Sequence, residues 1–188
     1  MRWFRGLTLA VVGTSMLVTS FVTTAGAAAP AKTKPPKWAA QVCTSLGDWV
    51  EQIETASATA SATPPTTPAD GKKALLKLIG TTIKATNKLL GQLKKAGTPA
   101  VDDGKGVAKV ISDQVKVMQT ALTSARSTVK TIPPDDGPAF VAQSRTAQDA
   151  IEAGIEGVNG AIQIATNLDD PALVAAFNGE AACTEITS

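Results

Sequence analysis

The sequence predicts an all-α protein: an antiparallel four-helix bundle with a short C-terminal fifth helix, closed by one disulfide. Apolar residues recur at spacings of three and four along four long segments, which is the period of an amphipathic helix, and no segment alternates with period two. Short turns join most of these segments, as in an up-down-up-down bundle. Such a bundle brings the start of its first helix beside the end of its fourth, where Cys43 and Cys183 are found. We therefore expect these two cysteines to pair.

Residues 1–27 have the order of a secretory signal peptide. Two arginines precede an apolar run over 6–22, and small residues follow it. We expect cleavage after Ala27, a disordered segment over 28–36 and a single helical domain over 37–188. The alternative is an uncleaved anchor helix, for which the apolar run is short. Export places the protein outside the cytoplasm, secreted or at the cell envelope, where a disulfide persists.

The first helix is expected over about 37–56, and an exposed linker is expected after it. The apolar positions of this helix are Trp38, Val42, Leu46, Trp49, Val50 and Ile53. Residues 55–69 then consist only of Ala, Ser, Thr and Pro, which have little to bury. The hydroxyl residues of this linker are suited to O-glycosylation, or the segment is a plain tether. The sequence leaves both interpretations open.

Three long helices and one short helix are expected after the linker. The second helix begins at Asp70, a good N-cap residue, and ends at Gly97, which can adopt a left-handed cap. The third covers about 103–131, the fourth begins near Pro138, and a short fifth begins at Pro171. The predicted inner face of the third helix is Val107, Ile111, Val115, Met118, Leu122, Ala125 and Val129.

The composition excludes much of enzyme chemistry. The chain has no histidine and no tyrosine, and paired cysteines leave no thiol nucleophile. Three acidic pairs each directly precede a predicted helix, where a carboxylate caps free backbone amides. These pairs are Asp102-Asp103, Asp135-Asp136 and Asp169-Asp170. None belongs to an alternating acidic loop of the EF-hand type, so the pattern favours capping over a calcium site. We expect no enzyme activity, no metal and no cofactor.

Lysines form a continuous face on the second helix and extend onto the third. The positions are Lys73, Lys77, Lys84, Lys88 and Lys95, then Lys105, Lys109, Lys116 and Lys130. Residues 71–132 hold 12 Lys or Arg and 3 Asp or Glu, whereas 133–188 hold 1 and 9. Binding to an anionic surface is the functional interpretation. The alternative is a solvated face partly balanced by Asp149, Glu152 and Glu156. Nucleic acid is disfavoured, since the stripe has no aromatic residue for base stacking.

Glycines recur every three residues inside the fourth helix, at Gly154, Gly157 and Gly160. Each costs about 1 kcal/mol relative to alanine in a helix interior, so three of them require a reason. Close approach of a neighbouring helix is the structural reason, because small residues let helix backbones come together. A groove that admits an apolar ligand is the functional alternative.

Several features of the chain occur together in one group of exported proteins. They are the signal peptide, an early Trp and Cys, the Ser/Thr/Pro-rich gap, AGTPAVDDG over 96–104, Ala139-Phe140, and Ala-Ala-Cys at 181–183. In this organisation the chain resembles uncharacterised secreted helical proteins of actinobacteria. It departs from those relatives that look like lipoproteins, because no cysteine lies near the cleavage site. The resemblance implies an envelope or extracellular setting and carries no established activity.

These observations favour a secreted or envelope-associated helical module that acts by binding, without catalysis, and engages an anionic surface through its lysine face. The alternative is a small carrier that holds an apolar ligand, such as a lipid, in a groove of the bundle. An enzyme that uses carboxylates alone ranks below both, because no acidic pair is marked as catalytic rather than capping. The partner is not predicted; we expect a monomer that contacts membranes only peripherally.

Overall fold

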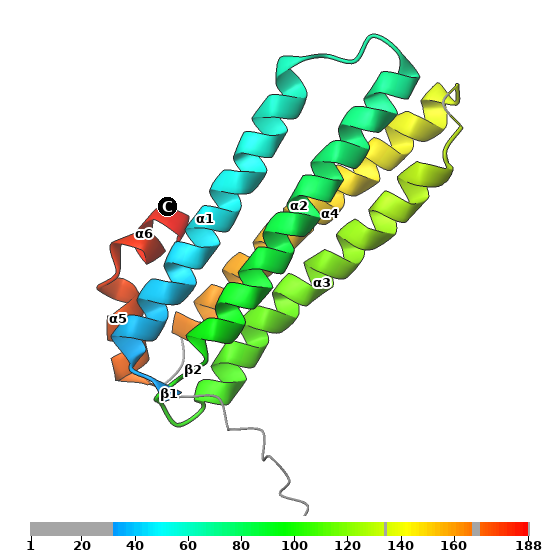
Figure 1. The fold of residues 1–188 in the computed structure, drawn as a ribbon. Coiled ribbons are helices and arrows are strands. Elements are labelled where there is room, and N and C mark those ends of the chain that lie inside the picture. The colour runs from blue at the N-terminus through cyan, green and yellow to red at the C-terminus, as the bar shows by residue number, and fades with distance from the viewer. Residues whose placement is uncertain (1–31, 134, 167–169, 188) are drawn as a thin grey trace, which may run out of the picture.

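The computed structural model describes residues 32–133, 135–166 and 170–187; the predicted signal peptide lies outside this part of the chain. Four long helices run up and down side by side, and two short helices lie against the lower part of the first (Figure 1). The elements are β1 (Lys32–Thr33), α1 (Pro35–Ala62), α2 (Pro68–Ala96), β2 (Thr98–Pro99), α3 (Gly104–Thr131), α4 (Gly137–Thr166), α5 (Pro171–Asn178) and α6 (Ala181–Thr187). The predicted all-α bundle and its disulfide are confirmed.

The first helix is longer at both ends than the sequence predicts. Residues 32–36, expected to be disordered, form β1 and the first turn of α1, and β1 pairs in parallel with β2. At the other end α1 continues through 55–62, so only 63–67 separate it from α2. Alanine, serine and threonine do not forbid a helix, and the first proline of this stretch is Pro64. The hydroxyl groups of Thr59 and Ser61 donate to carbonyls four residues earlier, so they are satisfied inside the helix.

The N-cap of α2 is Thr67 and not the expected Asp70. Thr67 Oγ1 accepts a hydrogen bond from the Asp70 amide at 3.1 Å and donates one to Asp70 Oδ2 at 2.7 Å. Pro68 then occupies the first helical position, where its fixed φ is favourable. At the far end Gly97 has the positive φ expected of it, 73°, and its amide donates to the Leu93 carbonyl.

Two of the three acidic pairs act as helix caps and one does not. Asp136 Oδ1 accepts from the Ala139 amide at 2.9 Å, and Asp170 Oδ1 accepts from the amides of Ala172 and Leu173 at 3.0 Å each. Asp103 precedes α3 but makes no side-chain capping bond, so the capping prediction is wrong there. Asp169 lies outside the described residues.

The predicted inner face of α3 is buried at all seven positions. The buried face of α2 also contains two threonines that apolar patterning overlooks. Thr82 and Thr86 satisfy their hydroxyls on carbonyls four residues earlier, and Trp49 Nε1 donates to Thr86 Oγ1 at 3.2 Å. Trp38 Nε1 donates to the Gly97 carbonyl at 3.1 Å, which fixes the lower end of α1 against α2. Both tryptophans therefore set how α1 pairs with α2.

The order of contacts along the bundle is α1, α2, α3, α4. The last two helices, α5 and α6, pack on α1, and α4 packs mainly on α3. Leu173 and Phe177 of α5 are buried, and the Phe177 ring meets Trp38 edge-on with 5.9 Å between centroids. The sequence predicts α5 but not α6, which is too short to show a periodic pattern.

Candidate functional site

The predicted lysine face exists on α2 as an exposed stripe. Lys73, Lys77, Lys84, Lys88 and Lys95 are all exposed. Their spacing places them on the side of the helix away from the buried Ile79 and Leu89. Lys73 makes the one ion pair of the stripe, 3.7 Å from Asp70 within the same helix. The other four have no carboxylate within 4.0 Å among the described residues.

The lysines of α3 are exposed as well, but two of them share a carboxylate. Lys109 and Lys116 both bind Asp113, and the distance from Lys116 Nζ to Asp113 Oδ1 is 2.9 Å. Hydrogen bonds from Lys109, the larger contribution, and from Lys116 hold the pKa of the Asp113 carboxyl below its ordinary value of 3.8. The remaining predicted lysines of this helix, Lys105 and Lys130, are exposed and make no ion pair with any described residue.

Three contacts fix how α2 and α3 lie against each other. Gln119 Nε2 donates to Asn87 Oδ1 across the outer seam between the two helices. About two helical turns further along the seam, the guanidinium of Arg126 approaches Gly80. A Cβ built on Gly80 would lie 3.8 Å from an Nη atom of Arg126. At the top, Lys72 Nζ donates to the carbonyls of Lys130, at 2.8 Å, and Ile132. Lys72 was not among the predicted site residues, and it caps the C-terminal end of α3.

The acidic residues of α4 do not balance the lysine face. Asp149, Glu152 and Glu156 are exposed, and their spacing places them opposite the buried Ala147 and Val158. Every ion pair of the described residues joins side chains of the same helix, in α2 or α3. The basic surface on α2 and α3 and the acidic surface on the outer side of α4 are therefore separate, with no ion pair between them among the described residues.

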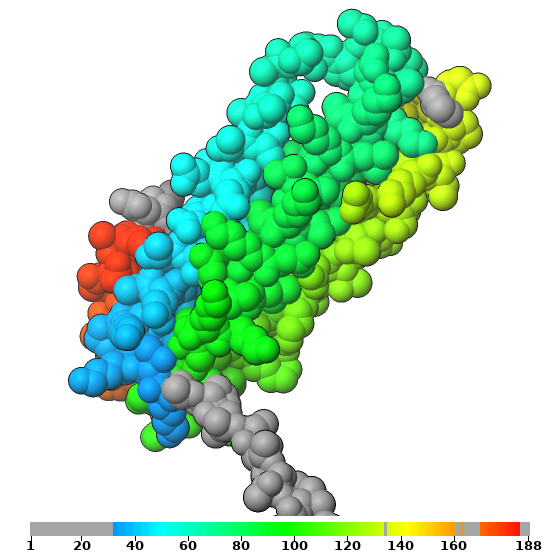
Figure 2. Space-filling model, viewed as in Figure 1, coloured from blue at the N-terminus to red at the C-terminus, as the bar shows by residue number. Residues whose placement is uncertain are grey.

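A groove of about 1030 Å³ lies between the upper parts of α1 and α2. Figure 2 shows the opening between these two helices below the link that joins them. From 55 to 62 α1 consists only of Ala, Ser and Thr, whose short side chains do not fill the space beside α2. The wall is mainly apolar, with Ala56, Ala60 and Leu78, and Lys77 and Lys88 are among the polar residues that line it. The sequence shows the run of small residues, but the groove depends on how α1 is oriented toward α2.

The three glycines of α4 have different surroundings. A Cβ at Gly154 would lie 2.4 Å from Met118 Cγ of α3, and one at Gly157 would lie 3.0 Å from Gln114 Oε1. A Cβ at Gly160 would have no atom of the described residues within 4 Å. Close helix approach is therefore the reason for Gly154 and contributes at Gly157, and it does not explain Gly160. The groove in the structure lies between α1 and α2, away from this glycine row.

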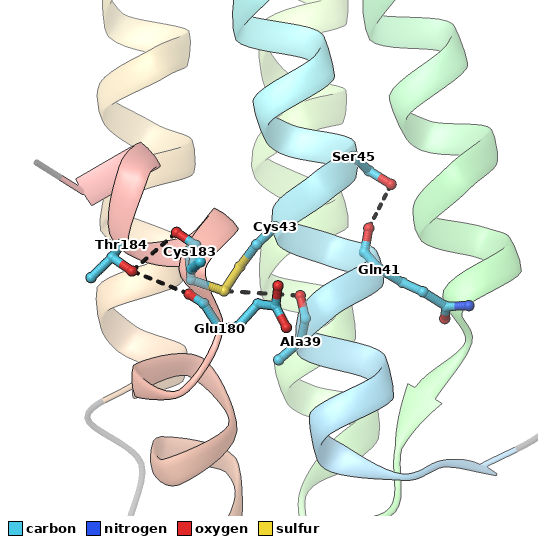
Figure 3. Close-up of a disulfide and its surroundings, with 8 residues drawn as sticks. Ala39, Gln41, Cys43, Ser45, Glu180, Cys183 and Thr184 are labelled. Atoms are coloured by element: carbon cyan, nitrogen blue, oxygen red, sulfur yellow. Dashed lines mark hydrogen bonds between the residues drawn. A yellow bond between two sulfur atoms is a disulfide. The ribbon is translucent and has the colours of Figure 1, made fainter.

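The two cysteines form a disulfide between α1 and α6, with their Cα atoms 4.9 Å apart (Figure 3). Both are buried, and neither is a free thiol. The described residues contain no group of three or more His, Cys, Asp or Glu side chains that could hold a metal ion. None of the helices in this part of the chain is long and apolar enough to cross a membrane.

The chain matches no family model, no curated protein and no solved structure in comparisons with known proteins. The candidate site therefore rests on its own geometry, which offers two surfaces: the basic face of α2 and α3, and the groove between α1 and α2.

Proposed function

We propose that this protein is an extracytoplasmic binding module that attaches to an anionic surface through the basic face of α2 and α3, without catalysing a reaction. One observation carries the proposal. Lys77, Lys84, Lys88 and Lys95 are exposed along α2, and no carboxylate of the described residues pairs with them. Such a concentration of one sign of charge attracts anions and raises their rate of association.

Secretion is a second part of this proposal. The N-terminal arginines, apolar run and small residues support export, and the disulfide is of the kind that persists in oxidising compartments. A non-catalytic role is supported by the lack of histidine and by the disulfide, which occupies both thiols.

Sedimentation with vesicles of phosphatidylglycerol and phosphatidylcholine tests the proposed attachment. We expect retention at low salt that is lost as salt rises, because exposed charges are screened over about 10 Å at 0.1 M ionic strength. The double variant Lys77→Glu, Lys84→Glu is expected to abolish retention. A matched control, Lys37→Glu with Arg145→Glu, makes the same change in net charge outside the basic face. Retention that is absent, or that salt does not weaken, contradicts attachment to a lipid surface.

The groove favours a second candidate function: carriage of a single-chain lipid. Its mainly apolar wall would take the chain, and the head would lie among Lys77 and Lys88 and the carboxylates of Asp48, Glu51 and Asp70, which line the same groove. Palmitate is a suitable probe, with complexes counted by native mass spectrometry. Ala60→Phe is expected to fill the groove and reduce binding, whereas Ala58→Phe, on an exposed position that does not line it, is expected to leave binding unchanged. Equal binding by both variants, or none by the wild type, rejects this candidate.

A further inference from the structure

The contacts between α2 and α3 place basic residues of the two helices level with each other. Seven residues separate Gly80 from Asn87, and seven separate Gln119 from Arg126, so both contacts belong to one antiparallel register. This register brings three pairs of lysines to nearly the same height along the bundle, with each lysine at most two residues from the position directly opposite its partner. The pairs are Lys95 with Lys109, Lys88 with Lys116, and Lys77 with Lys130. Lys84 and Arg126 fall between the last two levels. We call these eight residues the basic ladder.

All eight residues of the basic ladder are exposed, and they flank the outer seam between the helices. Gly80 and Asn87 follow Lys77 and Lys84 by three residues, and Gln119 follows Lys116 by three, which makes each of them a neighbour on the same helix face. Asp113 is the single carboxylate that pairs with a member of the ladder in the described residues. Like charges that face one another destabilise the fold, and a bound polyanion would remove that repulsion.

The shape of the basic ladder indicates a chain-like partner. From Lys77 to Lys95 the ladder is about 27 Å long at 1.5 Å per residue, and it is only two helices wide. On its α1 side lie the carboxylates of Asp48 and Glu51, which line the groove together with Lys88. A broad anionic plane would meet these carboxylates as well as the lysines, whereas a narrow chain along the seam would not.

The ladder also lacks the anchors that membranes and single-stranded nucleic acids use. Among the described residues the exposed large apolar side chains are Val117 and Val141, and neither belongs to it. No aromatic residue lies within the ladder to stack on a base. We infer that the basic ladder binds a linear polyanion that lies along the seam between α2 and α3. This inference rests on the proposed function and names the class of its partner.

Inorganic polyphosphate is the probe that tests this inference. We compare a long chain with tripolyphosphate at equal total phosphate, using isothermal titration or fluorescence anisotropy at low salt. A polymer that spans several levels of the ladder is expected to bind at least about tenfold tighter per phosphate than tripolyphosphate, because its contacts form together. Equal affinity per phosphate would overturn the inference.

A pair of variants tests the position of the site. Lys88→Gln with Lys116→Gln removes one level of the ladder, and Lys37→Gln with Arg145→Gln removes the same charge elsewhere. The first is expected to weaken long-chain binding about tenfold and to reduce the slope of log K against log salt by about 1.4, since each lost phosphate contact changes it by about 0.7 on a single-stranded polyanion. The second is expected to change the affinity less than about twofold. Equal losses for both pairs would overturn the inference.

The vesicle experiment separates this inference from the proposed function. Binding to vesicles without binding to polyphosphate leaves the proposed function in place and rejects the linear partner. Binding to polyphosphate without binding to vesicles supports the linear partner and rejects attachment to a lipid surface. Binding to neither probe rejects both. Circular dichroism melts of each variant confirm that it folds, so a loss of binding reports on the site.

Discussion

At the scale of single residues, Asp113 limits the strength of the basic ladder. Its carboxylate holds Lys109 and Lys116 together and so reduces the charge that these lysines offer to an anion. Asp113→Asn is expected to strengthen polyphosphate binding several-fold. Asp149→Asn on the outer side of α4 makes the same change in net charge and is expected to have a smaller effect. Equal gains for both variants would contradict a local role for Asp113.

The same carboxylate gives Asp113→Asn a second signature, in the dependence of stability on pH. Because its pKa in the folded protein is lowered from 3.8, Asp113 stabilises the fold at neutral pH, and this stabilisation disappears as pH falls through the folded pKa. Thermal melts are expected to show Asp113→Asn slightly less stable than the wild type at pH 7 and equal to it near pH 2. A stability difference that persists at low pH would assign the effect to something other than the ion pairs.

Replacement by alanine is expected to have opposite effects on stability at two glycines of α4. Gly154→Ala places a methyl group 2.4 Å from Met118 Cγ, so α4 must move away from α3 or Met118 must repack. We expect a loss of about 1–3 kcal/mol of unfolding free energy, the usual effect of overpacking. Gly160→Ala meets open space and gains up to about 1 kcal/mol from helix propensity. Urea unfolding measures both, and a stable Gly154→Ala would show that this contact is loose.

At the scale of elements, the sequence predicts the buried faces of helices with a regular apolar pattern, but it does not predict all of the residues at which the helices begin and end. The seven-residue inner face of α3 follows from its sequence alone, because burial of that stripe stabilises the helix. The end of α1 does not, since 55–62 has no apolar stripe, and its Ala, Ser and Thr side chains border the groove beside α2. The sequence offers both Thr67 and Asp70 as N-cap residues of α2. In the structure Thr67 is the cap, and Asp70 hydrogen-bonds to the Thr67 hydroxyl through both its amide and its side chain.

The candidate site was predictable only one helix at a time. The spacing of Lys77, Lys84 and Lys88 shows that they share a face of α2. Their alignment with lysines of α3 depends on the contact between Asn87 and Gln119, which joins positions that no sequence period relates. The groove likewise depends on the pairing of α1 with α2, which Trp38 and Trp49 set through hydrogen bonds.

Repulsion between neighbouring lysines of the basic ladder is expected to destabilise α2. Lys84 and Lys88 are like charges four residues apart and have no acidic partner within 4.0 Å among the described residues. Such a pair destabilises a helix by about 0.2–0.5 kcal/mol. Lys84→Gln is therefore expected to raise the melting temperature at 10 mM salt and to have no effect at 0.5 M, where charges are screened. Lys116→Gln, which also loses the contact with Asp113, is the control and is not expected to stabilise. A stabilisation by Lys84→Gln that survives high salt would contradict this explanation.

At the scale of the whole molecule, the disulfide joins the two ends of the described chain. It links residues 140 positions apart and connects α6 to α1. The two C-terminal helices depend on this bond to different degrees. Leu173, Ala176 and Phe177 bury α5 against the bundle, whereas Cys183 is the buried side chain of the described part of α6. Apolar contact of three buried side chains can therefore hold α5 in place without the bond. Over 181–184, the part of α6 whose side chains are described, Cys183 is the one buried residue and Ala182 packs beside the core.

Replacing both cysteines should consequently release α6 before the rest of the bundle. For Cys43→Ser with Cys183→Ser we expect a loss of up to about 5 kcal/mol in urea unfolding, the chain-entropy value for a loop of this length. Native-state hydrogen exchange is expected to show the amides of α6 losing protection at low urea, while α5 and α3 retain theirs. Reduction of the wild type under native conditions should give the same order and excludes an effect of the serines. Simultaneous loss in α5 and α6 would instead mean that the disulfide holds the entire C-terminal pair, and that the contact between Trp38 and Phe177 is too weak to keep α5 on α1.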